Sequence, residues 1–219
     1  MNQLFDGLRE AINLIIGGDT ALVEIVLLSL QVSGIALLIS TFIGVPLGAL
    51  MGLSRFIGRR FIIVILYTGM GFPPVVVGLF VYLMLSRSGP LGSMNVWWVP
   101  DLFTPGAMVA AQVIIAVPLV AGFTMAAVLG VDKNLRNQVE ALGATRWQST
   151  LAVLGEARAG VIVAIVAGFG GIISEVGAVM LVGGNLEGKT RVLTTAIVVE
   201  TRQGACDLAI ARGSIWLTL

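Results

Sequence analysis

The stretch from Ile25 to Leu53 reads IVLLSLQVSGIALLISTFIGVPLGALMGL and contains no charged residue. It is longer than the roughly 20 apolar residues that an α-helix needs to cross the hydrocarbon core of a bilayer. Two more uncharged runs reach that length, 61–86 and 102–131, and a fourth run, 159–186, holds Glu175 as its single charge. Because backbone groups in lipid must pair with one another, and no alternating pattern favours a barrel, these runs predict membrane-spanning helices.

The composition also favours a chain that is embedded in a membrane. Hydrophobic residues make up 57% and charged residues 11% of the sequence, whereas soluble domains carry about 45–50% and about 25%. The mean hydropathy is +1.00. A net charge of +1 argues against nucleic acid as a partner. Histidine is absent and Cys206 is the single cysteine, so the sequence predicts neither an internal disulfide nor a metal site.

We predict a single, all-α, polytopic transmembrane domain over residues 1–219 with about five membrane-spanning helices. The spans are expected near 21–53, 61–86, 104–130, 159–182 and 204–219. For residues 1–19 two interpretations are open, an amphipathic segment on the outer surface of the membrane and a simple tail. The last span is short, so we expect the natural span to continue beyond Leu219.

Glycine and proline inside the spans predict local packing and bending. Gly44, Gly48 and Gly52 recur at every fourth residue, the spacing that lets two helices approach closely. Prolines remove intrahelical hydrogen bonds, and we expect them to kink or break their helices. The prolines concerned are Pro46, Pro73, Pro74 and Pro118.

Basic residues cluster in two loops, the one that follows the first span and the one over 132–158. These residues are Arg55, Arg59, Arg60, Lys133, Arg136, Arg146 and Arg158. Because positive residues near span ends remain on the cytoplasmic side during insertion, both loops should face the cytoplasm. The N-terminus should then lie outside.

The loop over 132–158 is the most specific feature of the sequence. Its centre reads EALGATRW, from Glu140 to Trp147, and combines helix formers with a glycine and a tryptophan. A solvated loop gains nothing from an exposed indole, whereas a docking interface gains rigid contact area from Trp147 and a charged anchor from Arg146. Chemistry alone leaves two interpretations open, a loop that binds a partner and an anchor at the membrane surface.

This octapeptide resembles the coupling-helix motif, or EAA loop, of ABC importer permeases. In that family the short helix fits a cleft of a cytoplasmic ATPase subunit, and the glycine ends the helix where the chain turns. The resemblance implies ATPase-coupling roles for the residues of the motif, which are Glu140, Ala141, Leu142, Gly143, Ala144, Thr145, Arg146 and Trp147. Two parts of the family pattern are not matched. When the LG of the pattern is aligned with Leu142 and Gly143, the leading EAA of the pattern falls on Asn137–Val139, and its downstream LP falls near Gly155–Glu156.

Two further stretches are similar to the tungstate-type branch of the molybdate and sulfate permease group. They are Leu154–Gly160 (LGEARAG) and Ile173–Met180 (ISEVGAVM), the latter followed by Gly183–Asn185. The resemblance implies the type I (MetI-like) permease fold in the cytoplasmic membrane of a prokaryote. It also implies a chain that is not an enzyme and that translocates a small oxyanion, with tungstate favoured over molybdate and sulfate.

The resemblance implies partners as well. A separate cytoplasmic ATPase would hold ATP-Mg, so no cofactor is expected on this chain. A second copy would complete the pathway as a homodimer, an extracytoplasmic solute-binding protein would deliver the cargo, and lipid would surround the spans. Residues 183–190 match the P-loop pattern G-x-x-x-x-G-K-T, but they follow a membrane helix rather than a β-strand, so we interpret the match as chance.

Glu175 needs an explanation of its own. A carboxylate at mid-helix costs ~2.5 to 3.5 kcal/mol on insertion scales, so it should face the bundle interior or a polar cavity. Because a bare carboxylate would repel an oxyanion, we expect a structural or gating role in which Glu175 is hydrogen-bonded near Ser174 and Gly177. Two alternatives remain open, a hydrogen bond that only packs helices and a proton-coupled carrier that uses Glu175.

Overall fold

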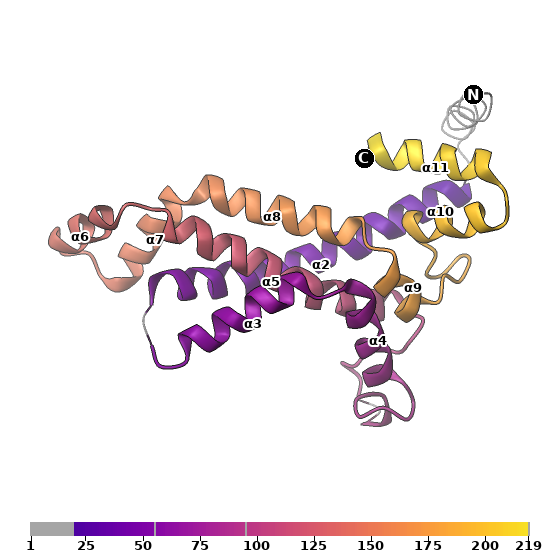
Figure 1. Ribbon diagram of the computed structural model, residues 1–219, viewed down its shortest axis with the longest axis horizontal. Coiled ribbons are helices and arrows are strands. Elements are labelled where there is room, and N and C mark those ends of the chain that lie inside the picture. Colours follow the sequence, from indigo (N-terminus) through magenta and orange to yellow (C-terminus); the bar gives the residue numbers. More distant parts are fainter. Residues whose placement is uncertain (1–19, 55, 95, 219) are drawn as a thin grey trace. The chain divides into compact units, whose positions relative to one another are not determined.

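The computed structural model describes residues 20–54, 56–94 and 96–218, and every regular element in these ranges is helical (Figure 1). The predicted amphipathic segment over 1–19 lies outside the described residues. The elements are α2 (Thr20–Leu53), α3 (Arg59–Gly71), α4 (Pro74–Leu85), η1 (Gly92–Met94), α5 (Pro105–Leu129), α6 (Lys133–Ala141), α7 (Arg146–Glu156), α8 (Arg158–Ile173), α9 (Gly177–Gly183), α10 (Leu193–Arg202) and α11 (Cys206–Thr218).

Two described helices are long and apolar enough to cross a membrane by themselves. These are α2, with 34 residues, and α5, with 25 residues. Both continue through their internal prolines, so of the two expected effects, a kink or a break, Pro46 and Pro118 do not cause a break. Membrane helices tolerate proline where neighbouring groups satisfy the carbonyl that the ring leaves without a partner.

Two other predicted spans are interrupted in the structure. Between 61 and 86 the chain forms the bent pair α3 and α4, which is broken next to Pro73 and Pro74, as these two prolines predict. Between 159 and 182 it forms α8 and α9, separated by Ser174–Val176. α7 and α8 are bent by 69° at Ala157, and counting each bent pair as one span gives up to four spans. The segment predicted near 204–219 forms α11, of 13 residues.

The chain forms two compact units. One contains residues 1–34, 74–111 and 173–219, and the other contains residues 35–73 and 112–172. In the second unit, the glycine face of α2 lies against α5. A Cβ atom added at Gly44 would come within 2.9 Å of the Val120 Cβ, and one at Gly48 within 2.8 Å of the Thr124 Cβ. The predicted close helix approach along these glycines is therefore confirmed.

In the first unit, α4 packs on α9 and α10 packs on α11. At the α4–α9 contact, Gly78 lies directly against Ala178. A separate apolar cluster joins the start of α2 to α10 and α11, and its buried members are Leu22, Ile25, Leu193, Ala196, Ala211 and Ile215.

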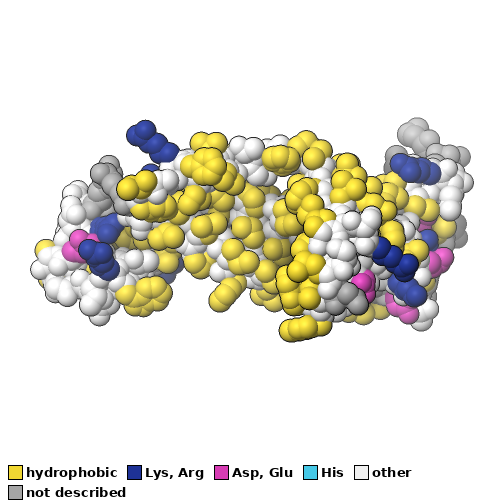
Figure 2. Space-filling view, turned by 90° about the horizontal axis from the view of Figure 1, so that it is seen from below, with side chains coloured by type: hydrophobic (Ala, Val, Ile, Leu, Met, Phe, Trp, Pro, Cys, Tyr) yellow, Lys and Arg dark blue, Asp and Glu magenta, His cyan; other side chains and the backbone are white. Residues whose placement is uncertain are grey.

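Large hydrophobic side chains are also exposed along the helices, as in Leu38 (72% exposed) and Phe42 (83% exposed) on α2. On the face drawn in Figure 2, hydrophobic side chains form broad patches, and few charged side chains lie among them. Soluble proteins rarely expose apolar surface of this extent. The surface therefore fits lipid as the surrounding solvent.

Candidate functional site

The loop between α5 and α8 forms two short helices with well-defined starts. The Asp132 carboxylate accepts a hydrogen bond from the Asn134 N–H at 2.9 Å and caps α6. The Thr145 hydroxyl accepts from the Gln148 N–H at 3.3 Å, and the Gln148 side chain accepts from the Thr145 N–H at 2.8 Å, which is a capping box at the start of α7. Each cap satisfies amides that a helix N-terminus leaves without a partner.

The turn between the two helices is built around Gly143. Its φ is +88°, in the left-handed region that glycine adopts without strain. The Gly143 N–H donates to the Glu140 carbonyl at 3.0 Å and the Ala144 N–H donates to the Val139 carbonyl at 3.2 Å. This pair of bonds is the Schellman motif that closes many helix C-termini. The glycine thus ends α6 and turns the chain into α7.

The turn presents two large apolar side chains to the surroundings. Leu142 is 89% exposed and Trp147 is 70% exposed. Of the predicted coupling residues, Glu140 and Ala141 end α6, Leu142 to Ala144 form the turn, Thr145 caps α7, and Arg146 and Trp147 begin it. Because the caps and the turn fix the backbone, the exposed side chains are presented on a preorganised surface, which lowers the entropic cost of binding a partner.

A polar network connects this loop to the end of α2. The Arg136 guanidinium donates from Nη1 to the Leu53 carbonyl and from Nε to the Glu140 carboxylate, both at 2.9 Å. The same carboxylate oxygen accepts from the Ser149 hydroxyl at 3.3 Å. The hydrogen bond from Arg136 is the main cause that holds the pKa of Glu140 below its usual value. The sequence identified Arg136 only as a basic loop residue, and gave no signal for its contact with Leu53.

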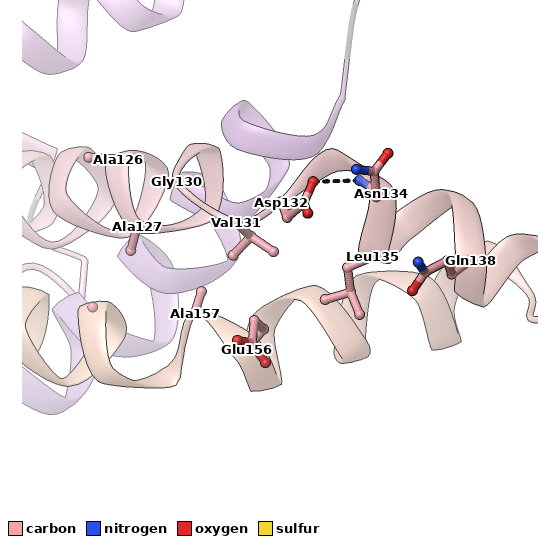
Figure 3. A pocket seen from close by; sticks show the side chains of 11 residues that line it. Ala126, Ala127, Gly130, Val131, Asp132, Asn134, Leu135, Gln138, Glu156 and Ala157 are labelled. Carbon is pink, nitrogen blue, oxygen red and sulfur yellow. Dashed lines mark hydrogen bonds between the residues drawn. The ribbon is translucent and has the colours of Figure 1, made fainter.

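A pocket opens beside the loop, between the end of α5, α6 and the junction of α7 with α8 (Figure 3). Asp132 turns toward the Asn134 amide, and Glu156 lies on the facing helix. The polar lining consists of two carboxylates, from Asp132 and Glu156, and two carboxamides, from Asn134 and Gln138. This lining suits a basic or polar group better than an oxyanion.

The second predicted site lies in the other unit, at the break between α8 and α9. Glu175 is not at mid-helix, and that expectation is wrong because the helix stops at Ile173. The Glu175 side chain accepts a hydrogen bond from the Ala178 N–H at 2.8 Å, and its carbonyl accepts from the Thr194 hydroxyl at 3.2 Å. Glu175 is 9% exposed. The carboxylate therefore satisfies an amide at the start of α9 that would otherwise be buried without a partner.

The other two residues predicted for this site surround the same break. Ser174 is exposed in the break, and Gly177 begins α9. A Cβ atom added at Gly177 would lie 3.5 Å from the Val75 Cβ of α4. Glu175 and Gly177 thus lie together at the packing contact between α9 and α4. The coupling residues and the Glu175 break belong to different units of the chain.

The sequence comparisons identify the type of protein that combines these features. The family described as binding-protein-dependent transport system inner membrane component matches residues 44–204, a range that includes the α6–α7 loop and the Glu175 break. The chain belongs to this family. It is the permease of an ABC importer, a multi-pass membrane protein and a transport component.

Several curated relatives resemble the permease along nearly its whole length. A probable anion ABC transporter permease protein of Haloferax volcanii is 44% identical over 91% of this chain and 86% of the relative. The tungstate uptake system permease protein TupB of Peptoclostridium acidaminophilum is 38% identical over 100% of this chain and 94% of the relative. The molybdenum transport system permease protein ModB of Escherichia coli K12 is 31% identical over 90% of both chains.

Proposed function

We propose that this permease translocates a small oxyanion, with tungstate as the favoured cargo, and that a separate ATPase drives it through the α6–α7 loop. The observation that carries the coupling role is the exposure of Leu142 and Trp147 on a capped, preorganised turn. Aromatic side chains on a rigid surface are typical anchors of protein interfaces. The eight residues from Glu140 to Trp147 would form the coupling segment, with the exposed side chains of Leu142 and Trp147 as its contacts to the ATPase, and ATP-Mg would be held by the partner.

The proposed orientation places this loop in the cytoplasm and the N-terminus outside. Arg136 and Arg146 lie in the segment that joins α5 to α8, while Arg59 begins α3 and Arg158 begins α8. The distribution of positive residues near span ends sets membrane orientation. The ATPase and the loop would then share one compartment, and an extracytoplasmic solute-binding protein would deliver the cargo to the opposite side.

The proposal of an oxyanion cargo rests on the relatives and on the chemistry of the helices. The curated relatives include permeases for an anion, for tungstate and for molybdenum. No Lys or Arg occurs in α2, α4 or α5, so an anion would cross on hydroxyls, backbone amides and helix ends. Most of the affinity for the cargo would then reside in the binding protein. A second copy of the chain would supply the other half of the pathway.

Co-purification with the ATPase tests the coupling role. Trp147→Ala removes the exposed indole and is expected to lose most of the retained ATPase. Trp97→Ala is the matched control, because Trp97 is also exposed, at 96%, but lies in the segment between α4 and α5. Equal retention by both variants would contradict a docking role for the α6–α7 loop.

Competition during uptake tests the cargo. Membrane vesicles with the complete transporter should accumulate tungstate, and molybdate should compete more strongly than sulfate if the pathway and binding protein belong to the tungstate-type branch. Accumulation of sulfate with no inhibition by tungstate would contradict this cargo while leaving the coupling role intact.

A further inference from the structure

Arg136 contacts two different helices with one guanidinium group. Its Nη1 donates to the carbonyl of Leu53 at 2.9 Å, and its Nε donates to the Glu140 carboxylate at 2.9 Å. Leu53 is 83 residues away in sequence and is the last residue of α2. A planar guanidinium can serve two acceptors in fixed directions, which a lysine ammonium does not do.

The position of Leu53 explains why a cation is stabilising there. The last carbonyls of a helix have no intrahelical partner, and the helix dipole gives them partial negative charge. Arg59 supports the same helix end, since its Nε donates to the Met51 carbonyl at 2.7 Å. The end of α2 is therefore held by two arginines, one from the adjacent α3 and one from the distant loop.

A chain of hydrogen bonds connects Arg136, through Glu140, to α7. Glu140 accepts from the hydroxyl of Ser149, whose residue is 2% exposed within α7. Beneath these polar groups lies an apolar cluster with Val128, Val153 and Ala157 at its centre and Leu53 packed against it. Within this unit, the polar chain thus joins α2, α6 and α7, and the apolar cluster joins α2, α5 and α7.

We propose that Arg136 is a positioning residue that transmits movement of the coupling loop to the cytoplasmic end of α2. The proposal rests on the proposed function, in which an ATPase subunit moves this loop. The surface offered to the ATPase, Leu142 and Trp147, is distinct from the groups that hold α2, which are Arg136 and Glu140. Docking and transmission should therefore be separable by mutation.

The test uses the complete transporter, with ATPase and binding protein, reconstituted in proteoliposomes. Two quantities are measured for each variant, the ATPase retained per permease and the tungstate moved per ATP hydrolysed. Arg136→Leu should retain ATPase like the wild type, while tungstate moved per ATP falls by about fivefold, the effect expected for a half-exposed ion pair. Arg136→Lys should give a smaller loss because it keeps the charge but not the two-pronged geometry.

Arg60→Leu is the matched control, because Arg60 is an exposed arginine at the start of α3 and its removal changes the charge of the same side equally. It should leave both quantities unchanged. Glu140→Leu removes the oxygen that accepts from both Arg136 and Ser149, and it should reproduce the loss of Arg136→Leu if that variant is poorly produced.

Two results would overturn the proposal. One is loss of ATPase by Arg136→Leu to the extent seen in Trp147→Ala, which would make Arg136 part of the docking surface. The other is an unchanged amount of tungstate moved per ATP in both Arg136→Leu and Glu140→Leu. Failure of the proposed function has a different signature, because the wild type itself would then retain no ATPase.

Discussion

At the scale of single residues, Gly143 is a position where the backbone conformation alone restricts the side chain. A Cβ atom at Gly143 would meet no atom within 4 Å, so Gly143→Ala is opposed by the positive φ alone. We expect a cost of about 1 to 2 kcal/mol in the stability of the turn. Hydrogen exchange of the α6–α7 amides measures this cost directly.

Gly155→Ala provides the control for that experiment. A Cβ atom at Gly155 would also meet no atom within 4 Å, but Gly155 lies inside α7 and has no positive φ. This variant should slow exchange in α7, since alanine favours a helix over glycine by about 1 kcal/mol. If both variants shifted exchange in the same direction, the left-handed turn at Gly143 would not be the restriction.

Glu175 allows a second prediction at this scale, which separates a capping role from proton transfer. A glutamine oxygen can accept the Ala178 N–H as the carboxylate does, whereas leucine cannot. Glu175→Gln should therefore keep most of the transport activity and Glu175→Leu should lose it, as measured by ATP-dependent tungstate uptake. Loss of uptake in Glu175→Gln, together with a changed pH profile, would favour the proton-coupled carrier instead.

At the scale of helices, the packing of α2 against α5 depends on the absence of a side chain at Gly48. A Cβ atom there would lie 2.8 Å from the Thr124 Cβ and 3.0 Å from the Met125 backbone nitrogen, so Gly48→Ala must push the helices apart. We expect a loss of about 1 to 3 kcal/mol, seen as a lower thermal unfolding temperature in detergent.

Gly34→Ala is the matched substitution on the same helix, because a Cβ atom at Gly34 meets no atom within 4 Å. It should leave the unfolding temperature unchanged or raise it slightly. An equal loss in both variants would mean that α2 is sensitive to any substitution of glycine rather than to contact with α5.

The helices differ in how far the sequence predicts them. α2 and α5 follow from long uncharged runs, and the bend between α3 and α4 follows from Pro73 and Pro74. Proline does not always predict a break, because α2 and α5 continue through Pro46 and Pro118. Whether a proline breaks a membrane helix depends on neighbouring groups that sequence does not place.

The break between α8 and α9 shows another limit. The sequence contains no proline there, and the run over 159–186, with Glu175 as its single charge, predicts a single helix. The structure shows the Glu175 side chain bonded to the amide three residues later, and this local bond competes with the continuing helix. The contact of Arg136 with Leu53 was not predictable either, since nothing in a local pattern relates positions 83 residues apart.

At the scale of the whole molecule, the family was predictable because its motif is local. The LGA-x-RW core of the loop and the ISEVGAVM stretch are continuous in sequence, and the family match over 44–204 confirms the resemblance that they suggested. Membrane orientation, the homodimer and the roles of the coupling residues remain predictions, because they depend on partners and on the bilayer rather than on this chain alone.

The energy source of transport tests the central claim most directly. Proteoliposomes that contain the permease, the ATPase and the binding protein are loaded with ATP, and tungstate uptake is measured with the proton gradient intact and collapsed. We predict uptake that requires both ATP and the ATPase, is unaffected by collapse of the gradient, and is lost in Trp147→Ala. Uptake by the permease alone, driven by an imposed proton gradient without ATP, would contradict the account.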